Sequence, residues 1–462
     1  MKNCSFINNE ASDEAGVAYV RGRSSITVTN SNFNNNIAGS YGGVFVAYTL
    51  STITVDNSSF EYNEAGYDGG VVYAYDRCKI VFKDNCSFFN NTATEGGVVF
   101  ALNAVLEDLG STYSGNKAVS NGGVVALTKS DTRVKYSNFL SNTAGNSGGV
   151  LFTHVHRYKH NITLERNNFH GNEAIRGGVI ALLTNDFLSM TENKFTSNSA
   201  HQGGVVYLQS GNRLTVQDSL FVNNSGRRDG GVFHAVHNSD INVDSSSFNY
   251  NEAGYDGGVV YAFDRCKIVF KNNCSFFNNT ATEGGVVFAI NAVLEDLGST
   301  YSGNKAVSDG GVVASIKSDA SVKYSNFVSN TAGNSGGVLF TPVHHYKHKI
   351  TLERNNFHSN KAIRGGVISL LTNDFLSMTE NKFIFNSAHQ GGVVYLQSGN
   401  RLIVQDSMFI NNSGRRDGGV IYSENSNYVN ITNSVLNFNS AGVNGGVIYA
   451  SLENQIIITG MN

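Results

Sequence analysis

The sequence predicts an all-β fold, namely a right-handed parallel β-helix of about 17 coils with about 27 residues in each coil. A Gly-Gly pair recurs along the chain at intervals of 26 or 27 residues, apart from two intervals of 29. Apolar residues alternate or form short runs, and nowhere do they follow a helical period. The 462 residues include 50 Gly but one Pro, as expected of strands that have hydrogen-bonded neighbours on both sides.

Each period predicts three short strands and three turns. The first strand alternates, as at Ile53 and Val55, and the second begins at an aromatic residue such as Phe60. An Asn and an Ala follow, then the glycine pair and an apolar strand over 71–74. Equivalent residues of successive coils should stack, so the sequence predicts a column of aromatic rings in the core and a column of Asn amides that bond from coil to coil.

Bulk composition excludes several classes of function. Charged residues make up only 15% of the chain and the net charge is -3, which gives no basis for binding nucleic acid or an anionic membrane. No apolar run approaches the roughly 20 residues that a membrane-spanning helix needs, so we expect no membrane insertion. No signal peptide is visible, and we interpret the chain as a fragment whose leader and anchor lie outside it.

A longer repeat of 188 residues, or seven coils, is superimposed on the coil period. Roughly nine residues in ten match across this offset; Arg227-Arg228-Asp229, for example, becomes Arg415-Arg416-Asp417. We expect one continuous β-helix over 1–462, with repeat units at 58–245 and 246–433 and partial units at 1–57 and 434–462. The repeat is either a recent duplication or a multivalent array that shows the same binding surface twice.

The repeated Gly-Gly-Val and Phe-x-x-Asn motifs resemble those of the chlamydial polymorphic outer-membrane proteins and similar microbial β-helix repeats. The resemblance covers essentially all of the chain, although Val replaces the more usual Ala after the glycines. It implies a parallel β-helix and a role as a surface adhesin or passenger domain. More loosely, the tandem units resemble the scaffoldins of fungal cellulosomes, which are secreted proteins that collect enzymes on repeated docking sites.

The segment after each glycine pair is apolar at consecutive positions, as in 178–183, so one set of side chains must point out of the coil. Either the corner lets both sets pack, or the outward set forms a docking platform. Tyr and Arg are favoured contact residues in protein interfaces. The partner-binding candidates are Tyr67, Asp68, Tyr73, Tyr75, Arg227, Arg228 and Asp229, with Tyr255, Asp256, Tyr261, Arg415, Arg416 and Asp417 in the second unit.

The cysteines and the acceptor sequons for N-glycosylation favour a secreted protein. Each pair of cysteines flanks one strand, and we predict the local disulfides Cys78–Cys86 and Cys266–Cys274, with Cys4 left free. The alternative is buried free thiols. The glycosylation candidates are Asn57, Asn90, Asn161, Asn223, Asn278, Asn411 and Asn430.

Metal binding and catalysis have weak signals. Three imidazoles, His154, His156 and His160, occur in one long coil, but the second unit has Pro342 in place of His154, so we predict a solvated loop and no metal or cofactor. Some parallel β-helices are pectate lyases or polygalacturonases. The best carboxylate candidates here, Glu107-Asp108 and Asp76-Arg77, are both duplicated 188 residues on, and two identical open active sites on one chain would be unusual.

The sequence therefore predicts a non-catalytic extracellular or cell-surface scaffold that presents tandem, near-identical docking surfaces to other proteins, such as the docking modules of secreted enzymes. The alternatives are a cell-surface adhesin, for which carbohydrate is a further partner, and a polysaccharide lyase or hydrolase.

Overall fold

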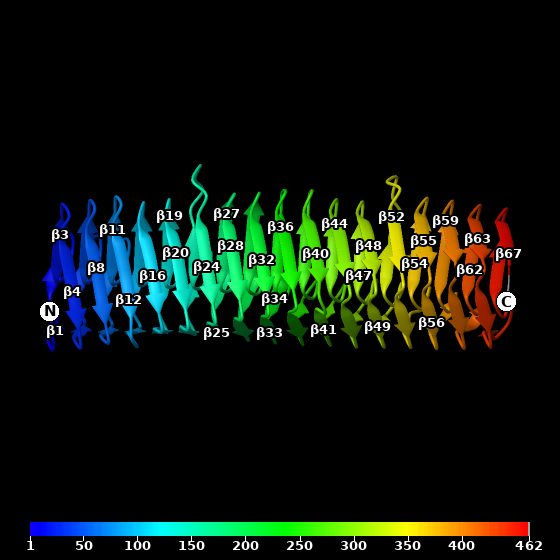
Figure 1. Cartoon of the computed structure of the whole chain (residues 1–462), viewed down its shortest axis with the longest axis horizontal. Coiled ribbons are helices and arrows are strands. Elements are labelled where there is room, and N and C mark those ends of the chain that lie inside the picture. The colour runs from blue at the N-terminus through cyan, green and yellow to red at the C-terminus, as the bar shows by residue number, and fades with distance from the viewer. Residues whose placement is uncertain (461–462) are drawn as a thin grey trace. The chain divides into compact units, whose positions relative to one another are not determined.

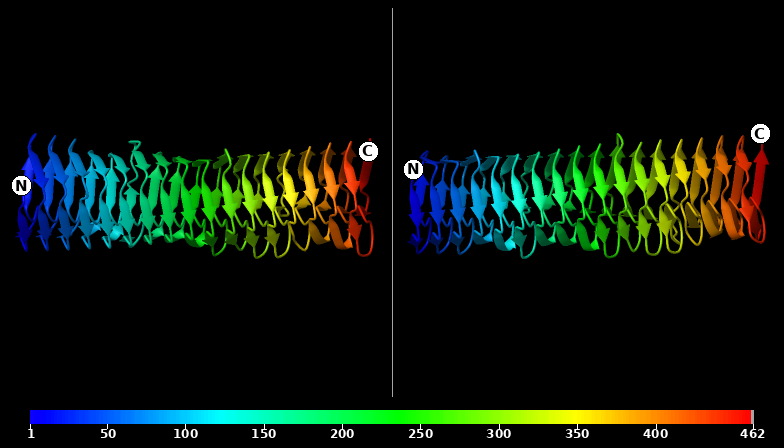
Figure 2. Two further views of the ribbon diagram at one scale, coloured as in Figure 1. Left: turned by 60° about the horizontal axis from the view of Figure 1, so that its bottom comes forward. Right: turned by 90° about the horizontal axis from the view of Figure 1, so that it is seen from below.

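The computed structural model describes residues 1–460 and confirms the fold class: the chain is an all-β parallel solenoid of about 17 turns. It separates into two compact units. Unit 1 comprises Met1–Arg227 with Gly231–Ala235, and unit 2 comprises Arg228–Gly230 with Val236–Asn462. Within each unit, equivalent strands of successive coils lie side by side (Figure 1 and Figure 2). The right-handed sense of the coil stays a prediction.

Most coils contain four strands, one more than the sequence predicted, and the coil that begins at residue 349 contains three. One coil of unit 1 comprises β8 (Thr52–Asp56), β9 (Ser59–Glu61), β10 (Glu64–Ala65) and β11 (Val72–Tyr75). Its counterpart in unit 2 comprises β36 (Asp240–Asp244), β37 (Ser247–Asn249), β38 (Glu252–Ala253) and β39 (Val260–Phe263). The additional element is the strand at the Ala position, called here the short arm, which has two to five residues and is too brief to show a period in sequence.

The predicted aromatic column forms the core beneath β9 and its equivalents. Parallel pairing places Phe60 beside Phe33 on one neighbouring coil and Phe88 on the other. The rings stack face to face, with centroids 4.7 Å apart for Phe33 and Phe60 and 5.0 Å apart for Phe60 and Phe88. In unit 2, Phe276, Tyr301 and Phe327 continue the same arrangement at 4.7 Å. Dispersion and burial of these rings stabilise each coil against the next.

The predicted Asn column is also present, as a buried amide ladder. The Oδ1 atom of Asn63 accepts a hydrogen bond from the backbone N–H of Asn36 at 3.0 Å and another from its Nδ2 group at 2.9 Å. The Nδ2 group of Asn63 in turn donates to the backbone oxygen of Phe33 and to Oδ1 of Asn91. The ladder therefore satisfies buried polar groups at a corner where the main chain leaves the sheet.

The glycine pair is required at the corner before β11 for two different reasons. Gly69 has φ +70°, and a Cβ atom there would lie 2.2 Å from the backbone oxygen of Val72. A Cβ atom on Gly70 would lie 2.3 Å from the backbone oxygen of Gly97 on the next coil. The first glycine thus supplies a left-handed conformation, and the second allows close approach of two coils.

Most outward side chains near the start of the strands that follow the glycine pairs are buried, which answers the question that the sequence left open. The outward residues Val46, Ala126 and Ala181 have no exposed surface. They form an apolar cluster with Tyr73 and Phe100, against which Tyr41 of the turn before a glycine pair also packs. Both sets of side chains therefore pack, and an exposed side chain such as Tyr75 lies at the end of its strand.

Two loops protrude beyond the other corners, one before β24 (Asn161–Glu165) and one before β52 (Lys349–Glu353) (Figure 1). These are the two coils of 29 residues, and the loop of the first contains the histidine cluster. Within residues 1–460, no helix is long and apolar enough to span a membrane.

Candidate functional sites

The tyrosine candidates of unit 1 lie together at the end of one coil, but they differ in exposure. Tyr67 and Tyr75 are 58% and 42% exposed, whereas Tyr73 is only 8% exposed and stacks on Phe100. Burial, followed by the nearby carboxylate of Glu95, raises the pKa of Asp68 to about 6. Only Tyr67 and Tyr75 therefore offer a ring to a partner, because most of Tyr73 belongs to the packed outer cluster.

The corresponding candidates of unit 2 have different neighbours. The backbone N–H of Tyr255 donates to the backbone oxygen of Arg228 at 2.8 Å, and Nε of Arg228 lies 3.3 Å from the Asp229 carboxylate. Burial, then the carboxylates of Asp229 and Glu283, raises the pKa of Asp256 to about 7. Burial and Asp229 raise the pKa of Tyr261 to about 12. Arg228, Asp229, Tyr255, Asp256 and Tyr261 thus form one cluster.

The remaining arginine candidates lie elsewhere. Arg227 is six coils beyond Tyr67 within unit 1, which places it about 29 Å away at the usual strand spacing. Its guanidinium pairs with Glu173 at 2.5 Å. In unit 2, Arg416 and Asp417 pair with each other, and Nδ2 of Asn444 donates to Asp417. The sequence candidates therefore do not form one patch that recurs in both units.

A different exposed network does recur, and sequence reasoning missed it. Tyr136 follows β20 (Asp131–Lys135), Arg166 follows β24 and Glu192 follows β28 (Phe187–Thr191), so parallel pairing brings the three residues into one row. The guanidinium of Arg166 donates to both carboxylate oxygens of Glu192, at 2.9 and 3.0 Å, and to the hydroxyl of Tyr136 at 3.0 Å. Its Cζ atom lies 5.7 Å from the centre of the Tyr136 ring.

The copy in unit 2 has the same geometry. Arg354 donates to Glu380 at 2.9 and 3.0 Å and to Tyr324 at 3.0 Å, with Cζ 5.7 Å from the ring centre. Tyr136 and Tyr324 are each 48% exposed. We call these two sets the Tyr–Arg–Glu networks. Each presents a rigid, partly exposed Tyr and Arg, which are the residue types that dominate protein interfaces.

The predicted histidine cluster is dispersed. The Nε2 atom of His154 lies 2.7 Å from a carboxylate oxygen of Glu95, and the half-buried His156 accepts a hydrogen bond from the backbone N–H of Tyr158 within the loop. His160 is fully buried, and its Nδ1 atom lies 2.6 Å from Oδ1 of Asp186. No group of three or more His, Cys, Asp or Glu residues in the described part of the chain could hold a metal ion. Two of the three imidazoles, those of His154 and His160, therefore attach the protruding loop to neighbouring coils.

The strongest carboxylate candidates for catalysis point to opposite faces of β16 (Val105–Leu109). Glu107 faces outward and pairs with Lys79 at 2.8 Å. Asp108 faces the core, where the hydroxyls of Ser111 and Ser137 donate to it, and burial raises its pKa to about 6. These two carboxylates cannot contact the same substrate bond, because a strand directs successive side chains to opposite sides.

The predicted disulfides are wrong: Cys78, Cys86, Cys266 and Cys274 are all free thiols, as is Cys4. The first pair flanks β12 (Lys79–Lys83), an extended strand that separates its ends by about 17 Å, whereas a disulfide needs Cα atoms within about 7 Å. The cysteines instead occupy corner positions that Ser fills in other coils: Cys86 lies between Ser58 and Ser111. Burial raises the pKa of Cys86 to about 11, which makes it an inert structural thiol.

Most of the predicted glycosylation candidates are accessible. Asn57, Asn90, Asn161, Asn223 and Asn411 are exposed, and four of these lie at corners with positive φ. Asn278 and Asn430 are half-buried. The structure thus leaves five sequons open to modification.

Searches with protein-family models and against the curated proteins found no match for this chain. Its function must therefore be argued from its own surface.

Proposed function

We propose that this chain is a non-catalytic scaffold that holds partner proteins on equivalent docking surfaces, one in each 188-residue repeat. The observation that carries the proposal is the pair of Tyr–Arg–Glu networks. Folding of the solenoid requires the buried Phe and Asn columns to recur, but it does not require an exposed three-residue network to recur with the same hydrogen-bond lengths.

Each network is suited to protein recognition. The bidentate bonds to Glu192 fix the Arg166 side chain before any partner binds, so that less conformational entropy is lost on association. Solvent screens this exposed pair, so it contributes little to folding, and we assign it a role in binding. The proposed partner is a small folded domain, such as the docking module of a secreted enzyme.

An extracellular location is part of this proposal. The exposed sequons support this location. Disulfides no longer support it, because the cysteines are free thiols. The same reasoning applies to a scaffold at the cell surface, since both settings require display of repeated sites to soluble partners.

The proposal can be tested by affinity capture with the full chain from the secreted proteins of its source. The double variant Arg166→Ala, Arg354→Ala should lose the captured proteins, because it removes the fixed guanidinium of both networks. Arg133→Ala is the matched control, since this exposed Arg has Ser321 at the equivalent position of unit 2. Capture of the same proteins by the double variant and by wild type would refute the proposed docking surface.

A further inference from the structure

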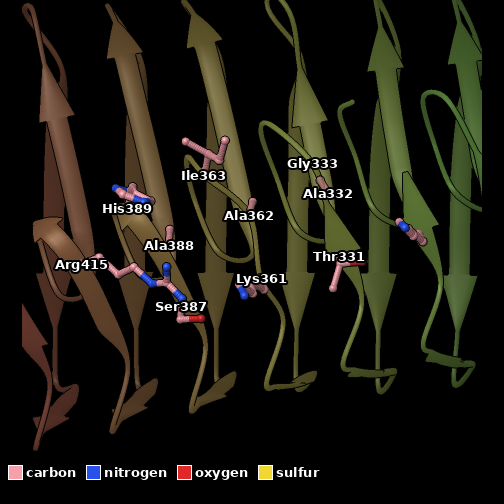
Figure 3. A pocket seen from close by; sticks show the side chains of 11 residues that line it. Thr331, Ala332, Gly333, Lys361, Ala362, Ile363, Ser387, Ala388, His389 and Arg415 are labelled. Carbon is pink, nitrogen blue, oxygen red and sulfur yellow. The ribbon is translucent and has the colours of Figure 1, made fainter. Parts of the chain in front are cut away.

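Each unit carries a shallow groove along its short arms. In unit 2 the hollow has a volume of about 360 Å³, and Ala332, Ala362 and Ala388 are among the residues that line it. Thr331 and Ser387 present their hydroxyls beside these alanines, and Arg415 extends toward Ser387 (Figure 3). The small side chains leave space over the arms, and this volume lies at the lower end of the range for ligand pockets.

The groove of unit 2 is lined by cations that have no acidic partner. Lys305, Lys361 and Arg415 are exposed, and among residues 1–460 none of them has a carboxylate within ion-pair distance. Lys305 and Lys361 lie two coils apart, and Arg415 lies two coils further on, so the backbone positions of the three cations recur about every 10 Å along the stack. This spacing is too wide for one small anion to contact all three.

The equivalent groove of unit 1 differs at one decisive position. It has a volume of about 300 Å³ and conserves Lys117, Thr143 and His201 as counterparts of Lys305, Thr331 and His389. However, Glu173 replaces Lys361, and its carboxylate binds the guanidinium of Arg227 at 2.5 Å. Within the described residues, the groove of unit 2 therefore carries three unpaired cations, whereas the groove of unit 1 carries one, Lys117, because Glu173 pairs with Arg227.

We propose that the groove of unit 2 binds a linear acidic polysaccharide, whose carboxylate or sulfate groups contact Lys305, Lys361 and Arg415, and that the groove of unit 1 does not. This inference goes beyond the docking of proteins and does not rest on it. A polymer that carries an acidic group on every sugar can place one of its closely spaced groups against each cation in the row, and the hydroxyls of Thr331 and Ser387 suit the hydroxyls of the sugars.

The structure favours a polysaccharide over an acidic peptide or a nucleic acid. Successive short arms are already paired: Lys305 with Thr331, Thr331 with Lys361, and Lys361 with Ser387. An extended peptide therefore finds no open strand edge to join. No Phe, Tyr or Trp lines the groove, so it lacks the large aromatic rings on which nucleic-acid bases stack most favourably.

Calorimetry of the full chain with oligogalacturonate, and separately with dextran sulfate, tests the inference. We expect one site per chain for at least one of these polymers, and no binding of neutral dextran. Lys361→Glu should weaken binding by about tenfold, because it reproduces the charge arrangement of unit 1. The variant should fold normally, since unit 1 already accommodates Glu at this position. The reverse change, Glu173→Lys, should create a second site and double the stoichiometry.

The control is Lys382→Glu, which makes the same charge change at an exposed position of β56 (Lys382–Ile384), outside the groove. Its affinity should stay within about twofold of wild type, allowing for long-range electrostatics. Binding of oligogalacturonate alone identifies carboxylates as the ligand groups, and binding of dextran sulfate alone identifies sulfates. Failure of both polymers to bind, equal affinity of Lys361→Glu and wild type, or tighter binding of poly-glutamate would overturn the inference.

Discussion

Removal of one Asn from the buried amide ladder should weaken the interface between two coils. Asn142 has no exposed surface, and its Oδ1 atom accepts from both the backbone N–H and the Nδ2 group of Asn116, each at 3.0 Å. Its Nδ2 group donates to the backbone oxygen of Tyr113 and to Oδ1 of Asn172, again at 3.0 Å. Asn142→Ala removes all four bonds, whereas the backbone N–H of residue 142 can still donate to Asn172.

The magnitude follows from the groups left without partners. Asn142→Ala leaves the buried backbone N–H of Asn116 and one hydrogen of its amide unsatisfied, and each such group costs about 1–3 kcal/mol. We expect a loss of about 2–6 kcal/mol in the local free energy of opening. Since each coil contacts only its neighbours, hydrogen exchange should accelerate in the coils around residue 142 and less in distant coils.

Native-state hydrogen exchange measured by mass spectrometry is the assay, and the chain supplies its own replicate. Asn330→Ala is the equivalent change in unit 2, where the bond lengths are the same. Asn138→Ala is the control, because Asn138 is exposed. A loss below about 1 kcal/mol for Asn142→Ala, or a loss equal to that of the control, would refute the claim that the ladder stabilises the stack.

Two further predictions concern ionisable groups. All five cysteines should react as thiols when the chain is unfolded without reductant, and a disulfide-linked Cys78–Cys86 peptide in a non-reducing map would contradict this expectation. Cys86→Ser should change the free energy of unfolding by less than about 1 kcal/mol, because Ser fills the same corner in other coils. The raised pKa of Asp256, about 7, means that the folded chain keeps a proton which the unfolded chain releases at lower pH, so stability should fall as the pH rises from about 4 to 7. Asp256→Asn should reduce this fall in urea titrations, and an unchanged pH dependence would refute the assignment.

The solenoid and its core could be predicted because stacking converts a sequence period into spatial contact. Phe60 and Asn63 recur at the same point of each period, so parallel pairing alone places their copies in columns. The burial of Val46 could not be predicted, because it depends on how the turn before the glycine pair folds over the outer face of the sheet.

The functional surface was harder to predict, since its residues are distant in sequence. Tyr136 and Arg166 are 30 residues apart, and Arg166 and Glu192 are 26 apart. Alignment of the coils would have placed all three directly after the first strand of successive coils. The disulfide prediction was wrong because Cys78 and Cys86, although close in sequence, occupy two different corners of the coil at opposite ends of β12.

The central claim, that the two Tyr–Arg–Glu networks are equivalent docking surfaces, is tested most directly by the stoichiometry of a purified partner. Sedimentation of the full chain with a protein recovered by affinity capture should give two bound molecules per chain. Arg166→Ala should leave one, and addition of Arg354→Ala should leave none, because distant and independent sites behave additively. One bound molecule on the wild-type chain, or the loss of both after Arg166→Ala alone, would contradict the account.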